Sequence, residues 1–351
     1  MKNIIVLGGG YGGLTAVQDL LSNIPADVKV TLVDRMPFGA LKTEYYALAA
    51  GTVSELDIRV SYPSHPQLQI VYGEVVGISF ENKSVHLLNN DPLFYDSLII
   101  ALGCTDNYHG IPGAPEFTAS VQSLSSTRST YQQLNDVRPY GQVTIIGGGL
   151  SGVEVASELR ESRPDLNIRI LDRSSLMSAF PTKLQKFVAA WFMEHHVELR
   201  SGIHTERIEQ GVIYNGSEEI LTDVAVWTAG IQPVKLVQDL VLPKDKQGRL
   251  IVNEFHELPD APDVFVIGDC SSQPFSPSGQ LAQAQASQVV QVLQARWSNR
   301  TIKLPRIQLK GTVGSLGKKS GFAVMGKTSL MGRIPRMLKS GVLWKSRRHF
   351  G

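Results

Sequence analysis

The fold is decided by the first residues of the chain. Residues 3–13 read NIIVLGGGYGG, an apolar strand that runs into the spacing G-x-G-x-x-G at Gly8, Gly10 and Gly13. Residues 14–21 follow with apolar side chains at helical spacing. In such a strand–turn–helix unit the first glycine permits the tight turn, the second permits a pyrophosphate to approach the backbone, and the third permits close packing of helix on strand. The stretch therefore predicts a phosphate-binding turn at the positive end of a helix.

The residues after this helix extend the pattern. A second apolar strand, residues 28–33, ends at Asp34, whose carboxylate could accept hydrogen bonds from a ribose. One copy of this pattern is a weak signal, because glycine turns between strands and helices are common.

The whole arrangement occurs a second time. Residues 143–152 read VTIIGGGLSG, with glycines at the same spacing at Gly147, Gly149 and Gly152, and a later strand ends at Asp172. Two copies in the same order predict two dinucleotide sites. A carboxylate at Asp172 favours the free 2′-hydroxyl of NADH over the 2′-phosphate of NADPH, although the adjacent Arg173 leaves NADPH open.

The remaining strands suggest how the chain is divided. Three further apolar strands run into glycine, at residues 97–103, 224–230 and 263–269. We expect an α/β fold with two Rossmann-like dinucleotide-binding domains, the second being inserted into the first. The expected parts are residues 1–105 with 245–300, residues 106–244, and a basic C-terminal segment of residues 301–351.

Composition excludes several classes of protein. With 42% apolar and 19% charged residues, the 351-residue chain is typical of a globular protein. Its two cysteines, Cys104 and Cys270, rule out a disulfide framework and fit a reducing compartment. There is neither a signal-peptide pattern nor an apolar run of about 18 residues, so we expect a cytoplasmic protein. No metal-binding pattern is found.

The positive charge gathers at the C-terminus. Residues 301–351 carry twelve Lys and Arg and no Asp or Glu, which leaves 22 basic against 32 acidic residues before them, a balance of −10. Such a tail suggests an anionic partner, either lipid headgroups or nucleic acid, and we do not expect nucleic acid. The pattern G-x-x-x-x-G-K-T at residues 321–328 matches a P-loop but lies too near the end of the chain, so we interpret it as a hairpin turn.

The end of this segment predicts an amphipathic helix. At 100° per residue over 334–348, apolar side chains gather on one half of the helix and polar ones, among them Arg336 and Lys339, on the other. The apolar half contains Ile334, Met337, Leu338, Val342 and Trp344. The pattern is typical of a helix lying on an anionic membrane surface, and a packed terminal helix is the alternative.

The order of these motifs resembles the two-dinucleotide flavoprotein reductases, and is most similar to the type II NADH dehydrogenases (NADH:quinone oxidoreductases). The resemblance covers about the first 290 residues. It rests on the first glycine turn and on residues 101–103, 107–113, 147–154, 227–231 and 266–269. It implies FAD and NADH as cofactors, and Glu154 and Gln283 as catalytic residues near the flavin. The FAD-binding residues implied are Gly8, Gly10, Gly12, Gly13, Asp34, Val75, Gly103, Gly268, Asp269 and Gln283. The NADH-binding residues implied are Gly147, Gly149, Gly152, Asp172 and Gly230.

One helix departs from the family pattern. The family carries two glutamines four residues apart near the flavin and the quinone. Here Gln283 is followed by Ser287, and Gln285 by Val289, so neither register keeps both glutamines. The acceptor therefore stays open between a quinone and another small molecule.

The cysteines restrict the reaction. The absence of a paired redox dithiol excludes the disulfide reductases of this superfamily. The resemblance implies hydride transfer from NADH to flavin and delivery of electrons to an acceptor without a redox disulfide, and a membrane quinone is the first candidate. A reductase of a ferredoxin-like carrier and a non-catalytic FAD/NADH-binding sensor are the alternatives. The oligomeric state is not predicted.

Overall fold

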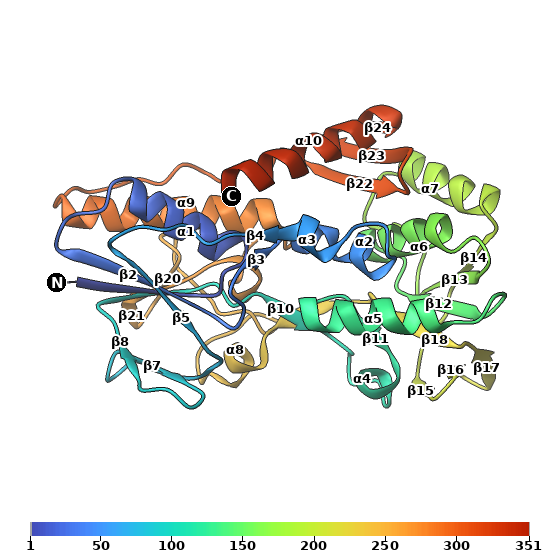
Figure 1. Cartoon of the computed structure of the whole chain (residues 1–351), viewed down its shortest axis with the longest axis horizontal. Coiled ribbons are helices and arrows are strands. Elements are labelled where there is room, and N and C mark those ends of the chain that lie inside the picture. The colour runs from blue at the N-terminus through green and yellow to red at the C-terminus, as the bar shows by residue number, and fades with distance from the viewer. Residues whose placement is uncertain (1, 351) are drawn as a thin grey trace.

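Two parallel sheets, each built around one glycine turn, form the body of the molecule. The computed structural model describes residues 2–350, and gives no side-chain description for residues 342 and 344–350. Figure 1 shows the two sheets side by side along the long axis, with the C-terminal segment above them.

The first sheet contains the N-terminal strand. Its order is β20-β21-β9-β1-β2-β5, and all pairs are parallel except β20–β21. The strands are β20 (Glu257–Leu258), β21 (Ala261–Val266), β9 (Ser97–Ile100), β1 (Lys2–Leu7), β2 (Val28–Asp34) and β5 (Leu68–Tyr72). β1 is at the centre, which explains its continuous apolar run, because both faces of a parallel sheet are covered by other elements. Helices α1 (Tyr11–Ser22) and α9 (Gly279–Trp297) pack on each other over this sheet (Figure 1).

The second sheet is parallel throughout, in the order β11-β18-β12-β13-β14. Its strands are β11 (Ala119–Ser120), β18 (Val224–Trp227), β12 (Gln142–Ile146), β13 (Asn167–Asp172) and β14 (Val197–Ser201). Its helices are α5 (Leu124–Asp136), α6 (Leu150–Ser162) and α7 (Thr182–Glu194). The chain therefore visits the first sheet, builds the second, and returns to the first, as the α/β interpretation predicts.

Smaller elements join and extend the two sheets. The antiparallel ribbon of β10 (Cys104–Asp106) and β19 (Ile231–Pro233) links them, since β10 follows β9 and β19 follows β18. The short sheets are β3 (Gly39–Ala40) with β4 (Arg59–Val60), β6 (Val75–Ser79) with β7 (Ser84–Leu87) and β8 (Leu93–Phe94), and β15 (Arg207–Glu209) with β16 (Val212–Asn215) and β17 (Glu218–Leu221). The short helices are η1 (Lys42–Glu44), α2 (Tyr45–Ala49), α3 (Glu55–Ile58), α4 (Ala114–Phe117), α8 (Lys235–Asp239) and η2 (Gly268–Cys270).

The C-terminal segment forms a small sheet and a helix. Strands β22 (Thr312–Leu316), β23 (Ser320–Met325) and β24 (Thr328–Gly332) pair in sequence, and α10 (Arg333–Phe350) packs against them. The P-loop-like letters fall on β23, the turn at Gly326 and Lys327, and the start of β24, which confirms the hairpin interpretation. β22 also packs on α6, so this segment covers the second sheet's helix layer (Figure 1).

Candidate active site at the two glycine turns

The first glycine turn has the geometry that a pyrophosphate site needs. A Cβ at residue 13 would lie 1.8 Å from the carbonyl oxygen of Gly8, so only glycine permits this packing of α1 on β1. A Cβ at residue 10 would meet no atom within 4 Å, because that position faces open space. Gly12 packs α1 against Ile267 and α9. The turn therefore leaves room for FAD where a side chain would intrude.

Asp34 is held in place by the turn itself. Its Oδ2 accepts a hydrogen bond from the amide of Gly9 at 2.6 Å, and its Oδ1 accepts one from the amide of Met36 at 2.8 Å. A carboxylate has about four acceptor sites, so ribose hydroxyls can still bind to it. Val75 begins β6, just beyond the carboxyl end of β5, whose following residue Gly73 donates its amide to the carbonyl of Asp34 at 3.0 Å. Val75 is thus on the same edge as Asp34.

One neighbour of this turn, Tyr62, has no signal in the sequence. A Cβ at Gly9 would lie 2.3 Å from the hydroxyl of Tyr62, so the ring covers Gly9 closely. Burial, and then the charge of Asp34, raise the pKa of Tyr62. A Tyr62 hydroxyl that stays protonated can donate, and it lies where the adenosine end of FAD is expected. No local pattern could reveal a contact made by an irregular segment 53 residues after Gly9.

The second turn repeats the first almost atom for atom. A Cβ at residue 152 would lie 2.0 Å from the carbonyl oxygen of Gly147, and one at residue 149 would meet nothing within 4 Å. Asp172 accepts from the amide of Gly148 at 2.7 Å and from that of Ser174 at 2.7 Å. The residues present therefore fit a second dinucleotide, NADH.

Gly230 lies at the carboxyl edge of the second sheet, after β18. His109 covers it: a Cβ at residue 230 would be 2.8 Å from the His109 Nε2, which lies 3.1 Å from the carbonyl oxygen of Ala229. A histidine ring therefore borders the expected NADH site, and sequence reasoning had missed it.

The other glycines expected at the FAD site gather at the carboxyl edge of the first sheet. Gly103 follows β9 and Gly268 follows β21, while a Cβ at Gly8 would touch the Ala101 carbonyl oxygen at 2.5 Å. Cys104 receives a hydrogen bond from the Lys42 ammonium at 3.1 Å and lies beside Asp269. Strands far apart in sequence thus bring Gly8, Gly103 and Asp269 to one edge.

The cysteines are not arranged for redox chemistry. Burial raises the pKa of Cys104 to about 12, even though Lys42 acts to lower it. Burial also raises the pKa of Cys270, whose thiol donates to the carbonyl oxygen of Gly103 at 3.2 Å. Because the thiolate is the reactive form, both groups stay inert near neutral pH.

The packing of helix α9 distinguishes the two possible alignments with the glutamine pair of the family, Gln283 with Ser287 and Gln285 with Val289. Gln285 is fully buried, accepts from the amide of Gly268 at 2.7 Å and donates to Ser271 at 2.9 Å, so it holds the turn at Gly268. Val289 is part of the core. Gln283 is partly exposed, and Ser287 donates to Asp19 on α1 at 2.6 Å. Of these two glutamines, Gln283 is therefore the one that stays partly accessible.

Glu154 belongs to a buried polar cluster beneath the C-terminal segment. It is 7% exposed and forms an ion pair with Lys339 of α10, which is 6% exposed. The amide of Ser315 on β22 donates to its Oε1 at 3.1 Å. On the helical wheel Lys339 lies opposite the apolar half, and in the structure it turns toward the body of the molecule, where the buried carboxylate attracts the ammonium. Arg336, on the expected polar side, is half-buried.

A second buried acid, Asp106, sits in the ribbon between the sheets. It is 2% exposed; Ser120 donates a short hydrogen bond to its Oδ2, and its Oδ1 has no partner among the described residues. Burial raises its pKa to about 6, against the lowering effect of Ser120 and Lys42. The sequence offered no signal for it, because the strand is only three residues long.

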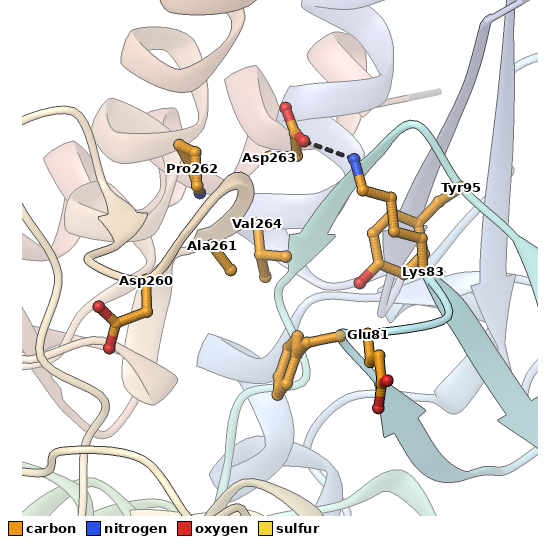
Figure 2. A pocket seen from close by; sticks show the side chains of 9 residues that line it. Glu81, Lys83, Tyr95, Asp260, Ala261, Pro262, Asp263 and Val264 are labelled. Atoms are coloured by element: carbon orange, nitrogen blue, oxygen red, sulfur yellow. Dashed lines mark hydrogen bonds and ion pairs between the residues drawn. The ribbon is translucent and has the colours of Figure 1, made fainter.

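A separate cavity lies away from the glycine turns. It measures about 300 Å³ and is bordered by the turn from Phe80 to Lys83 and by residues 260–264 at the amino end of β21, the edge opposite the glycine turns. Figure 2 shows the ion pair of Lys83 with Asp263, at 2.7 Å, across it. The Tyr95 hydroxyl is closed off from solvent. This cavity is not part of the dinucleotide sites.

Known proteins resemble this chain in both sequence and fold. A family model described as pyridine nucleotide-disulphide oxidoreductase matches residues 2–289. The NADH dehydrogenase-like protein YutJ of Bacillus subtilis (strain 168) is 50% identical over 355 residues, covering 100% of both chains. A type II NADH:quinone oxidoreductase of Staphylococcus saprophyticus is 26% identical over 381 residues, covering 96% of this chain and 93% of the relative. The solved structure of NDH2 from Plasmodium falciparum in complex with NADH has a TM-score of 0.87 at 18% identity, covering 99% of this chain and 96% of that one.

These likenesses confirm the resemblance inferred from the glycine turns. The family model covers more than half of the chain, and the Bacillus relative aligns along all of it. The solved structure adds that the fold extends through the C-terminal segment. The chain belongs to the pyridine nucleotide-disulphide oxidoreductase family.

Proposed function

We propose that the chain is an FAD-dependent NADH oxidoreductase that passes electrons to a quinone at an anionic membrane surface. The observation that carries the first part is the repeated turn, with open space at Gly10 and Gly149 and a fixed carboxylate at Asp34 and Asp172. The relatives named NADH dehydrogenase-like protein and type II NADH:quinone oxidoreductase support the choice of donor and acceptor.

Each part of the site has a role in this proposal. Bound FAD supplies the redox chemistry, and the protein supplies placement and electrostatics. The turn at Gly8 to Gly13 binds the FAD pyrophosphate and the turn at Gly147 to Gly152 binds that of NADH. Asp269 holds the ribitol chain of FAD. Gln283 faces the flavin, and Glu154 holds or moves a proton through its carboxylate.

The inert thiols support direct transfer to an outside acceptor. Cys104 and Cys270 stay protonated, so no dithiol relay is available among the described residues. A single retained glutamine, Gln283, with Ser287 tied to Asp19, leaves a less polar acceptor site than the paired glutamines of the family.

The outer face of α10 supports the membrane part. Ile334, Met337 and Leu338 are 68%, 73% and 45% exposed, while Lys339 is turned inward. Exposed apolar side chains beside basic residues are typical of an interfacial helix. Val342 and Trp344, assigned to the same face from the sequence, lie outside the described side chains. No helix in residues 2–350 combines the length and the apolar character of a membrane span.

A spectrum of the purified protein tests the central proposal. We expect bound FAD, bleached anaerobically by NADH and less readily by NADPH, and reoxidised by a soluble quinone faster than by a ferredoxin-like carrier. A colourless protein that cannot be reconstituted with FAD would refute it. Faster turnover on the carrier would favour the alternative acceptor, and binding without any turnover would favour a sensor.

Vesicle co-sedimentation tests the membrane part. The double variant Met337→Ser, Leu338→Ser should bind anionic vesicles at least tenfold more weakly, because burying each side chain contributes about 1.5–3 kcal/mol. Higher salt should weaken binding further, since each basic residue adds about 1 kcal/mol near anionic lipid. Val241→Ser, at a side chain 99% exposed elsewhere, is the matched control and should change nothing. Equal binding by both variants would contradict the role of α10.

A further inference from the structure

The polar cluster around Glu154 extends to a second buried carboxyl group, which forms no ion pair with the cations whose side chains the structure describes. Glu44, in η1, is 6% exposed, and its Oε1 accepts a hydrogen bond from the hydroxyl of Tyr46 at 3.0 Å. The Tyr46 hydroxyl lies 3.3 Å from the Ser315 hydroxyl, which is 3.4 Å from Glu154 Oε1. Glu44, Tyr46, Ser315 and Glu154 therefore form one continuous chain of hydrogen-bonding groups from η1 to α6.

The charges around this chain do not balance if every carboxyl group is ionised. Glu154 is paired with Lys339, whose ammonium also lies 4.3 Å from the Tyr46 ring centroid and 3.3 Å from the Ser315 hydroxyl. Glu158, 2% exposed, accepts from Thr52 at 2.6 Å and lies near Arg336.

The hydrogen-bond partner of the Glu44 side chain is likewise a hydroxyl, that of Tyr46, and Glu44 forms no ion pair among the described residues. A buried carboxylate without a cation is costly, and a proton removes that cost. Burial, followed by the smaller effects of Glu154 and Glu158, raises the pKa of Glu44 despite the nearby Lys339.

We propose that Glu44 holds a proton at neutral pH and supplies it, through Tyr46 and Ser315, to Glu154. This inference rests on the proposed function. A hydride from NADH brings two electrons and one proton, whereas reduction of a quinone to a quinol consumes two electrons and two protons, so one proton must enter in each turnover. The O–H bond of Glu44 breaks as Tyr46 accepts its proton, Tyr46 and Ser315 each pass on their own, and the Glu154 carboxylate takes up one proton and gives it to the reduced acceptor. Water then returns a proton to Glu44.

Glu44 acts on Glu154 through Tyr46 and Ser315, so it is a positioning residue and not a catalytic one. Its place in the chain explains why an acid is buried so close to Glu154 and Glu158, where like charges destabilise one another. A purely structural Glu44 would have no reason to exchange its proton during turnover.

Infrared spectroscopy of the full FAD-bound chain tests the proton directly. The wild-type protein at pH 7 should show the carbonyl stretch of a protonated carboxyl group, which shifts in D2O and changes when NADH reduces the flavin. Glu44→Gln should lose this band. Glu257→Gln is the matched control, because Glu257 is 5% exposed but paired with Arg296, and it should keep the band. A band retained in Glu44→Gln would overturn the proposal.

Kinetics of Tyr46→Phe test the route, and keep the proposal open to refutation if Glu44→Gln does not fold. Loss of the hydroxyl should slow reoxidation of the flavin by a soluble quinone about tenfold and remove its decline at high pH, with FAD still bound. An unchanged rate and pH profile would overturn the route. If Glu154→Gln is slow while Tyr46→Phe is not, Glu44 fails and the proposed function stands. If the wild type does not reduce quinone, the proposed function fails, and the infrared band still reports on Glu44.

Discussion

Helices α1 and α6 begin at the same kind of turn but are covered differently. Two residues after the last glycine, α1 carries Thr15 and α6 carries Glu154, and both are buried. α1 packs on α9, and the Thr15 hydroxyl has no partner among the described residues. α6 packs on α2 and β22, where Glu154 meets Ser315 and Lys339. The two turns are alike because both have the geometry of a dinucleotide site, whereas the covers differ because α6 borders the buried cluster around Glu154 and α1 packs on α9 instead.

The largest effect should come from filling the close contact in each turn. Gly13→Ala places a methyl group against the Gly8 carbonyl, and Gly152→Ala does so against Gly147, at a cost of about 3–5 kcal/mol for the local packing. Gly13→Ala should lose FAD, whereas Gly152→Ala should stay yellow and lose NADH binding. Flavin absorbance measures the FAD content, and a titration with NADH measures NADH binding. Gly149→Ala, where the space is open, is the control: it should fold normally and weaken NADH alone. Normal FAD content in Gly13→Ala would break the comparison.

A somewhat smaller effect is expected at the position where the helices differ. Glu154→Gln removes the partner of a buried ammonium, which costs about 3 kcal/mol of stability, and should slow one half-reaction of the flavin ~10–100-fold. Thr15→Ala, at the equivalent position of α1, removes an unpartnered hydroxyl and should change stability by less than about 1 kcal/mol, with normal rates. Stopped-flow traces and urea unfolding measure both. Wild-type rates for both half-reactions in Glu154→Gln would make Glu154 a structural residue.

The turns could be predicted from sequence because their physics is local. Gly8 to Gly13 and Asp34 lie within one strand–helix–strand unit, so spacing alone indicates the contact between Asp34 and the turn. Lys339 is 185 residues from Glu154, and no periodicity indicates that pairing. The helical wheel separates Lys339 from the apolar half but does not indicate that its ammonium is buried, because amphipathicity describes average exposure and one buried carboxylate outweighs it.

The glutamines of α9 are intermediate between contacts that the sequence indicates and contacts that it does not. Gln283 and Gln285 look equivalent in the sequence, and only the packing on the turn at Gly268 separates them. Tyr62 and Asp106 had no signal at all, because each belongs to an irregular or very short segment. What sequence reasoning missed is therefore the set of contacts made across the folded molecule, and these contacts distinguish the two halves.

Asp106, in the ribbon of β10 and β19 between the two sheets, should make the stability of the protein depend on pH. The folded pKa of Asp106, about 6, lies above the ordinary 3.8, so the folded chain binds more protons between these values. Its stabilising contribution is complete below 3.8 and is lost as pH rises through 6, at most roughly 3 kcal/mol. Asp106→Asn keeps an oxygen that can accept from Ser120. Its free energy of unfolding, relative to that of the wild type, should be higher at pH 8 than at pH 5. Urea midpoints measure this, and parallel curves for variant and wild type would contradict it.

The smallest expected effect concerns Asp34 and Asp172, the carboxylates that hold equivalent positions beside the two turns. Asp172→Ala removes the acceptor for the Gly148 amide and for the ribose hydroxyl, and should weaken NADH binding about tenfold, or ~1.4 kcal/mol. NADPH should lose less, because its 2′-phosphate no longer meets a carboxylate and Arg173, exposed beside it, can pair with that phosphate. The ratio of the NADPH and NADH dissociation constants should therefore fall in Asp172→Ala. The matched change Asp34→Ala should weaken FAD and leave that ratio as it is. An unchanged ratio in Asp172→Ala would mean that the second turn binds its cofactor without discriminating at the ribose.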